Sequence, residues 1–208
     1  MASVSSVAVV YALGATALAV VLMLMVLLHV LEPGFDPSWR ILSEYSLGRY
    51  GLLMRIAFVA MGTGVIAIAL AISGAARPWS LSLALVAIGP LGAAFIDTDP
   101  ITTPRTQMSR RSNVHAALGS LFNLGFPAAA TVAGISAASD PATGTILAWA
   151  SVVPWITLAW FLGTNVRHTR PDAVGAPDVH IGWPNRVSIL AYLGWVALAA
   201  LTALMWSY

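Results

Sequence analysis

The chain has 208 residues, of which 59% are hydrophobic and only 9% are charged. A soluble domain carries about 25% charged residues, so this composition excludes an ordinary soluble domain and indicates a membrane protein. The ten basic residues are all arginine, and the formal net charge of +2 is too small to predict a nucleic-acid partner. The absence of cysteine excludes disulfides and thiolate nucleophiles.

Six apolar segments along the chain are each long enough, at about 1.5 Å per residue, to cross a hydrocarbon core of about 30 Å. They are residues 7–31, 51–72, 78–96, 114–136, 144–164 and 187–206. These segments and their short connections use the whole length. We therefore expect an all-α fold, a single domain over residues 1–208 that forms an integral membrane bundle of six transmembrane helices.

The first apolar segment is preceded by no positively charged side chain and is too long for a signal peptide, so we expect a retained helix. It ends at the Glu32-Pro33-Gly34 turn signal. The following residues, 35–50, mix aromatic and aliphatic side chains with charges. This mixture predicts a short amphipathic segment at the membrane interface, or one tucked back among the helices.

Charged residues are distributed very unequally between the two faces that six crossings create. The first, third and fifth connections, with the helix ends beside them, hold Arg40, Arg49, Arg55, Arg105, Arg110, Arg111, Arg167, Arg170 and Arg186. They also hold Glu32, Asp36, Glu44, Asp97, Asp99, Asp172 and Asp178. The opposite face has only Arg77 and Asp140. Because arginine excess marks the cytoplasmic side, we expect a cell-membrane protein with both termini outside.

Prolines occur inside three successive apolar segments, at Pro90, Pro127 and Pro154. A proline in a spanning helix bends the axis and frees a carbonyl, which protein or water then satisfies. Bent helices can enclose a cavity. The alternative is that these prolines reflect only the high frequency of proline in membrane helices.

Three titratable residues are candidates for catalysis near the charged face: Glu44, Asp97 and His115. A carboxyl group in an apolar setting has a raised pKa and can act as a general acid, and a neighbouring histidine can act as a base. Residues expected to bind or position a substrate are His29, Glu32, Tyr45, Arg55, Asp99 and Asn123.

Each candidate also has a purely structural interpretation. Asp97 and Asp99 can pair with Arg55, Arg105 or Arg110 at the interface, and such ion pairs are often unimportant.

The histidines differ in their expected settings. His29 can bond a carbonyl at a helix end, whereas His115 lies inside an apolar run with Asn123 about two turns deeper. His168 and His180 are expected to be solvated loop residues.

No metal motif such as His-Glu-x-x-His is present, and the sequence predicts no metal and no cofactor. A mixed site of imidazole and carboxylate ligands remains an alternative, since these suit zinc or iron. Its ligands would be His29, Glu32, Asp97 and His115.

Several short motifs occur in a characteristic order. They are HVLEP at residues 29–33, FDP at 35–37, LSEYSLGRYG at 42–51, IDTDP at 96–100, and His115 at the start of the fourth segment. In these motifs the chain resembles an uncharacterised prokaryotic multi-pass membrane family, domain of unknown function 998. The resemblance implies six or seven helices and a membrane location, with no established activity. It includes the three catalytic candidates.

The leading hypothesis from the sequence is an intramembrane enzyme that acts on a lipid or isoprenoid. Its partners would be membrane lipid and an apolar small-molecule or lipid substrate, and its reaction a cyclisation, isomerisation or hydrolysis. Two alternatives use the same residues without catalysis: a transporter or lipid-binding protein, and an assembly partner of a membrane complex.

Overall fold

The computed structural model describes residues 4–73, 78–136, 141–170 and 173–205, and within these ranges it contains helices and no strand. The α-helices are α1 (Val4–Leu31), α2 (Gly51–Ser73), α3 (Pro78–Ala93), α4 (Arg110–Ser136), α5 (Pro141–Ala150), α6 (Val152–His168) and α7 (Gly182–Met205). Three short 3₁₀ helices are η1 (Leu42–Leu47), η3 (Arg105–Gln107) and η5 (Pro177–Val179). The prediction of an all-α fold is confirmed.

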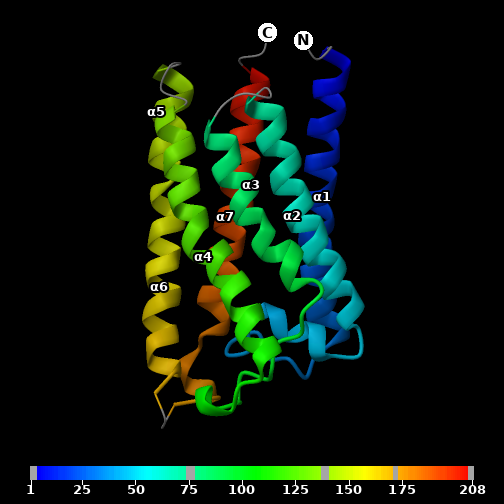
Figure 1. The fold of residues 1–208 in the computed structure, drawn as a ribbon, viewed down its shortest axis with the longest axis vertical. Coiled ribbons are helices and arrows are strands. Elements are labelled where there is room, and N and C mark those ends of the chain that lie inside the picture. The colour runs from blue at the N-terminus through cyan, green and yellow to red at the C-terminus, as the bar shows by residue number, and fades with distance from the viewer. Residues whose placement is uncertain (1–3, 74–77, 137–140, 171–172, 206–208) are drawn as a thin grey trace.

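The helices form one elongated bundle (Figure 1). The start of α1 and the end of α7 lie at the same end of this bundle. The connections α1–α2, α3–α4 and α6–α7 gather at the other end, which we call the loop end. The charged residues that the structure describes lie in these connections or in the adjoining helix turns. Arg77 and Asp140, predicted for the opposite face, lie outside the described residues.

Five stretches within the described helices are long and apolar enough to cross a membrane, which supports a multi-pass membrane protein. They are Val9–Leu31, Gly51–Leu70, Arg110–Ser136, Gly144–His168 and Gly182–Thr202. Leu81–Ala93 in α3 is apolar but shorter. The α3 helix ends before the predicted residue 96, and the next carbonyl, of Ala94, accepts a bond from Arg55 Nη1 at 3.1 Å. The Arg55 side chain therefore bonds a carbonyl that a further turn of α3 would have bonded with a backbone N–H.

The fifth predicted segment, 144–164, is broken into α5 and α6 at Ser151. Pro154 has no N–H to bond the Ala150 carbonyl four residues earlier, and the break lies within this turn. Beside the break, the Leu147 carbonyl accepts the Ser151 N–H at 3.0 Å and also bonds from Ser151 Oγ at 2.8 Å and Trp195 Nε1 of α7 at 3.3 Å. The second part continues to His168 and so ends four residues beyond the prediction.

The carbonyl that Pro127 leaves free is satisfied from another helix. Pro127 cannot donate to the Asn123 carbonyl, and the Tyr192 hydroxyl of α7 donates to that oxygen instead, at 2.9 Å. Tyr192 is completely buried and stacks on Phe126, with ring centroids 4.6 Å apart. These contacts join α4 to α7 in the centre of the core.

Helices α4 and α7 begin earlier than the predicted residues 114 and 187. Ser109 Oγ accepts the Ser112 N–H at 3.1 Å, which is the bond of an N-terminal cap and explains the early start of α4. In α7, Pro184 stands in the first turn, where proline is tolerated. Arg186, predicted to lie in a connection, is therefore a helical residue.

Candidate functional site

A cavity of about 490 Å³ lies inside the loop-end half of the bundle. Its volume falls within the range of about 300–1,000 Å³ that is usual for ligand pockets. Most of its lining is apolar, with Met54, Phe58 and Met61 from α2, Pro90 from α3 and Phe122 from α4. Of the three prolines that predicted bent helices, Pro90 of α3 lines the cavity.

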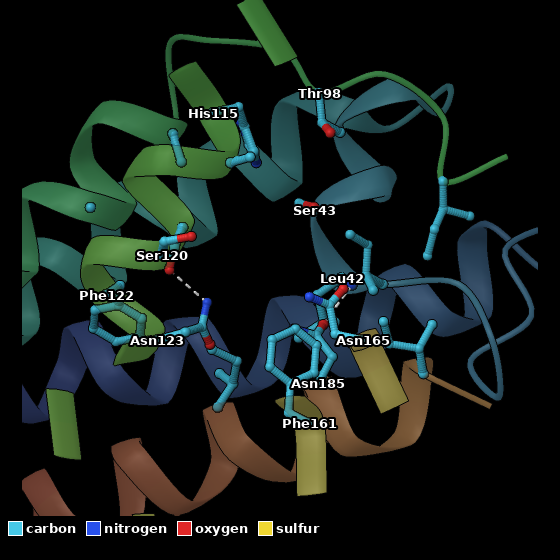
Figure 2. A pocket seen from close by; sticks show the side chains of 18 of the residues that line it. Leu42, Ser43, Thr98, His115, Ser120, Phe122, Asn123, Phe161, Asn165 and Asn185 are labelled. Atoms are coloured by element: carbon cyan, nitrogen blue, oxygen red, sulfur yellow. Dashed lines mark hydrogen bonds between the residues drawn. The ribbon is translucent and has the colours of Figure 1, made fainter. Parts of the chain in front are cut away.

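The polar part of the lining consists mainly of uncharged side chains from three helices. They are His115 and Asn123 of α4, Asn165 and His168 of α6, and Asn185 of α7. Figure 2 shows His115 and Asn123 on one side of the hollow and Asn165 and Asn185 across from them. The site therefore offers imidazole and amide groups to a molecule among apolar walls.

His115 is buried, and one edge of its ring is fixed. Its Nδ1 donates to the Ile96 carbonyl at 2.6 Å, and the ring meets Phe58 edge-on at a centroid distance of 6.0 Å. The hydrogen bond that fixes the ring uses Nδ1 and leaves Nε2 free of it, and Nε2 is not among the fully buried unpaired atoms of the described residues. The neutral ring then carries its proton on Nδ1 and a free lone pair on Nε2.

Two further lining residues each have one buried polar atom without a partner in the described part of the chain. His168 Nε2 donates to the Ile101 carbonyl at 3.2 Å, and its Nδ1 is unpaired. Asn123 Nδ2 donates to the Gly119 carbonyl at 2.7 Å, and its Oδ1 is unpaired. The great majority of buried polar atoms in proteins have a hydrogen-bond partner, so these two unpaired atoms are unusual.

Residues of the segments 41–43 and 98–108 line the cavity at the loop end, and we call these two segments the cover. Glu44 follows the first of these segments and holds the second, because its Oε1 accepts the Ile101 N–H at 2.8 Å. Its Oε2 lies 3.1 Å from Arg40 Nε. Asn185 Oδ1 holds the first segment by accepting the Leu42 N–H at 2.9 Å.

Glu44 is fully buried and does not belong to the lining. Burial raises the pKa of its carboxyl above the ordinary value of 4.5, although the Ile101 N–H and the Arg40 guanidinium act in the opposite direction. The predicted interfacial segment 35–50 is thus tucked against the bundle, with Leu42, Glu44 and Tyr45 buried.

A second polar cluster surrounds the guanidinium of Arg186, outside the cavity. Arg186 Nε donates to His29 Nε2 at 2.8 Å, its Nη1 to the Arg40 carbonyl at 2.6 Å, and its Nη2 to the Tyr45 hydroxyl at 3.3 Å. His29 Nδ1 bonds the Met25 carbonyl at 2.5 Å. His29 and Tyr45 therefore join α1, η1 and α7 rather than line the cavity.

Two acidic candidates, Glu32 and Asp99, have carboxylates that contact the residue before a helix. Glu32 Oε1 accepts the Tyr50 N–H at 2.7 Å, just before α2. Asp99 accepts the Ser109 N–H at 2.6 Å and the Ser109 hydroxyl at 3.0 Å, just before α4. A carboxylate is favourable at a helix N-terminus because of the macrodipole. Asp99 also borders the cavity.

The remaining candidates, Arg55 and Asp97, form an ion pair with each other. Both side chains are about one-third exposed, and neither belongs to the cavity lining. This is one of the pairs that the sequence allowed.

The structure brings only three of the predicted site residues to the cavity wall: His115, Asn123 and Asp99. Glu44 and Asp97 lie outside the lining. Within the described ranges, no three histidine or acidic side chains gather in a group that could hold a metal ion.

Sequence reasoning did not identify Asn165, His168 or Asn185 as site residues. The prediction that His168 is a solvated loop residue is wrong, because it is the last residue of α6 and is only 8% exposed. Asn165 and His168 are three residues apart and so share a helix face. That spacing was readable in the sequence, but the predicted helix stopped at residue 164.

No curated protein and no solved structure matches this chain. A family model described as "Protein of unknown function (DUF998)" matches residues 9–202, nearly the whole chain. The match agrees with the resemblance seen in the sequence motifs. The chain belongs to this family of proteins of unknown function.

Proposed function

We propose that this membrane protein binds a single lipid or isoprenoid molecule in the loop-end cavity. The observation that carries the proposal is a cavity of about 490 Å³ among apolar helices, with a mostly apolar lining whose polar part is mainly uncharged. Apolar walls suit an acyl or prenyl tail, and a few placed polar groups suit its head.

The exposure of two wall residues supports access from the bilayer. Leu124 of α4 and Leu162 of α6 both line the cavity and are 47% and 37% exposed. An opening between these helices would let a lipid pass sideways from the membrane without crossing water.

The charges near the cavity favour a ligand with an uncharged head. Asp99 already accepts two hydrogen bonds from Ser109, and Glu44 faces Arg40 and Ile101. Arg105 borders the cavity but is exposed in the cover. A cationic head would find no free carboxylate in the described lining.

The arrangement in the membrane is part of the same proposal. We place α3 as a sixth crossing within one membrane domain, with the arginine-rich loop end in the cytoplasm and both termini outside. Arginine excess in short connections supports this orientation. The start of α1 and the end of α7 lie at the same end of the bundle, which supports an even number of crossings (Figure 1).

Gly119 gives a direct test of ligand binding. It lines the cavity, and a Cβ built on it meets no atom within 4 Å, so a side chain can start there without a clash at its first atom. Gly119→Phe is expected to fill the cavity and abolish binding of a lipid such as monooleoylglycerol, measured by native mass spectrometry of the purified protein.

Gly163→Phe in α6 is the matched control, because Gly163 has the same free space but does not line the cavity. It should bind lipid as the wild type does. Equal binding by the Gly119 variant, the Gly163 variant and the wild type would contradict the proposal.

A second candidate function is acid/base chemistry on the bound lipid or isoprenoid, with His115 as the base. The free Nε2 of His115, with Nδ1 held by the Ile96 carbonyl, favours it. Glu44 or Asp97 would be the acid only after leaving its present partner. Unchanged turnover of bound lipid in a His115→Gln variant would contradict this function.

A further inference from the structure

We infer that the occupant of the loop-end cavity carries hydroxyl groups: it is an uncharged lipid alcohol whose head donates hydrogen bonds. This inference rests on the proposed function and specifies its ligand class. The observation behind it is that the unpaired polar atoms of three lining residues are all hydrogen-bond acceptors.

The three acceptors are His168 Nδ1 and Asn123 Oδ1, which are fully buried, and His115 Nε2, which is not among the fully buried unpaired atoms. In each side chain the other polar atom donates to a backbone carbonyl, of Ile96, Ile101 and Gly119 respectively. A carbonyl can only accept, so it fixes the proton of each ring and the orientation of the amide. The acceptor character of the free atoms is therefore set by the fold.

These acceptors lie on α4 and α6, two of the helices that line the cavity. His168 is 8% exposed and His115 is 6% exposed, so bulk water has little access to either ring. A buried acceptor without a partner is unfavourable, and a ligand that brings N–H or O–H groups removes that penalty.

One lining residue from α7 offers the opposite polarity. Asn185 Oδ1 is taken by the Leu42 N–H, which leaves the amide N–H groups to donate toward a ligand. A hydroxyl group both donates one hydrogen bond and accepts others, so it can serve Asn185 and an acceptor residue together.

Other common lipid heads match this pattern less well. Esters, ethers and quinone carbonyls only accept hydrogen bonds, so they would leave the three acceptors unpaired. A fatty-acid carboxylate has the same defect and adds a buried charge. An amine brings donors, but its positive charge has no free carboxylate in the described lining to pair with.

The test compares probes that differ only in their donors. Monooleoylglycerol has two hydroxyls, and its di-O-methyl ether keeps the tail and oxygens without an O–H. With the purified full-length protein in detergent, we expect the diol to bind at least tenfold more tightly, with Kd measured by native mass spectrometry. Geranylgeraniol and its methyl ether form a second pair, which shows whether the tail is prenyl or acyl.

Variants locate the effect at the named atoms. Asn123→Leu and His168→Phe each remove one acceptor and should lower the diol-to-diether affinity ratio at least threefold. Asn113→Leu and His180→Asn alter exposed residues outside the lining and should keep the wild-type ratio.

The outcomes separate the inference from the proposed function. Equal affinity for alcohol and ether in the wild type overturns the inference alone, and this comparison needs no variant to fold. A wild-type protein that binds neither pair overturns the proposed function as well. A wild-type preference that survives both acceptor variants also overturns the assignment to these atoms.

Discussion

Glu44 illustrates how a buried carboxylate can serve the architecture of a site without lining it. It is the acceptor for the Ile101 N–H, and this bond fastens the cover to η1. Glu44→Ala is expected to leave that N–H buried and unpaired, at a cost of about 1–3 kcal/mol in the free energy of unfolding. Glu44→Gln keeps an acceptor oxygen and should lose less. Chemical unfolding in mixed micelles measures both variants.

The pH dependence of stability gives Glu44 a second, independent readout. Burial raises its pKa above 4.5 in the folded protein, so the folded state holds the proton more tightly than the unfolded chain. The resulting stabilisation is fully present below pH 4.5 and is lost as the pH rises through the raised pKa. Glu44→Gln should lack this loss. If the stability of the wild-type protein rises as the pH increases from 4.5 through the raised pKa, Glu44 does not have the raised pKa assigned to it.

The sequence indicated the location of Glu44, Asp97 and His115 but not their partners. Alternation of crossings placed all three near the charged end, and the structure has them there. Asp97 forms an ion pair with Arg55. Glu44 lies beside the Arg40 guanidinium and accepts a hydrogen bond from the Ile101 N–H. Which partner a carboxylate finds depends on how helix ends and connections pack, and the spacing of residues in one sequence does not contain that information.

At the scale of helices, the prolines show how one missing N–H is compensated by a distant residue. The Asn123 carbonyl, freed by Pro127, accepts the Tyr192 hydroxyl. Tyr192→Phe is expected to cost about 1 kcal/mol, because it leaves this carbonyl unpaired. In a Pro127→Ala background the N–H of residue 127 can bond the same carbonyl, so the cost of Tyr192→Phe should fall.

A double-mutant cycle measures this coupling. The four proteins are compared by chemical unfolding in mixed micelles. If Tyr192→Phe lowers the free energy of unfolding equally with proline or alanine at position 127, the Asn123 carbonyl does not couple the two residues.

The positions of the prolines predicted bends, whereas the groups that satisfy them were not predictable. Trp195 bonds Ser151 at the break between α5 and α6, and Tyr192 bonds the carbonyl freed by Pro127; each lies 44 or more residues from its partner along the chain. Helix ends were missed for a related reason. Polar residues such as Asn165 and Arg167 suggested a loop, yet long polar side chains at the end of a spanning helix can extend to the interface while the helix continues.

For the whole molecule, the proposed arrangement in the membrane can be tested because the chain has no cysteine. Single cysteines appended to either terminus, or placed at Ala76, are expected to react with a membrane-impermeant maleimide on intact cells. Cysteines at Arg105 or Asp178, both exposed in connections at the loop end, should react only after permeabilisation.

Labelling of a cysteine at Ala76 distinguishes six crossings from five, because this position precedes α3 in the sequence. If it is labelled in the same compartment as Arg105, α3 does not cross the membrane and the count falls to five. Division of Arg105 and Asp178 between compartments would contradict the shared loop end itself.

Ile101 is fastened through both polar groups of its backbone: its N–H to Glu44 of η1, and its carbonyl to His168 of α6. In the proposed orientation, a molecule that approaches from the cytosol through the cover would meet these two attachments. A molecule dissolved in the bilayer meets neither of them on a path between α4 and α6. We therefore expect loading to depend on how strongly a compound partitions into the membrane, and a water-soluble short-chain analogue to exchange slowly even when its head group fits.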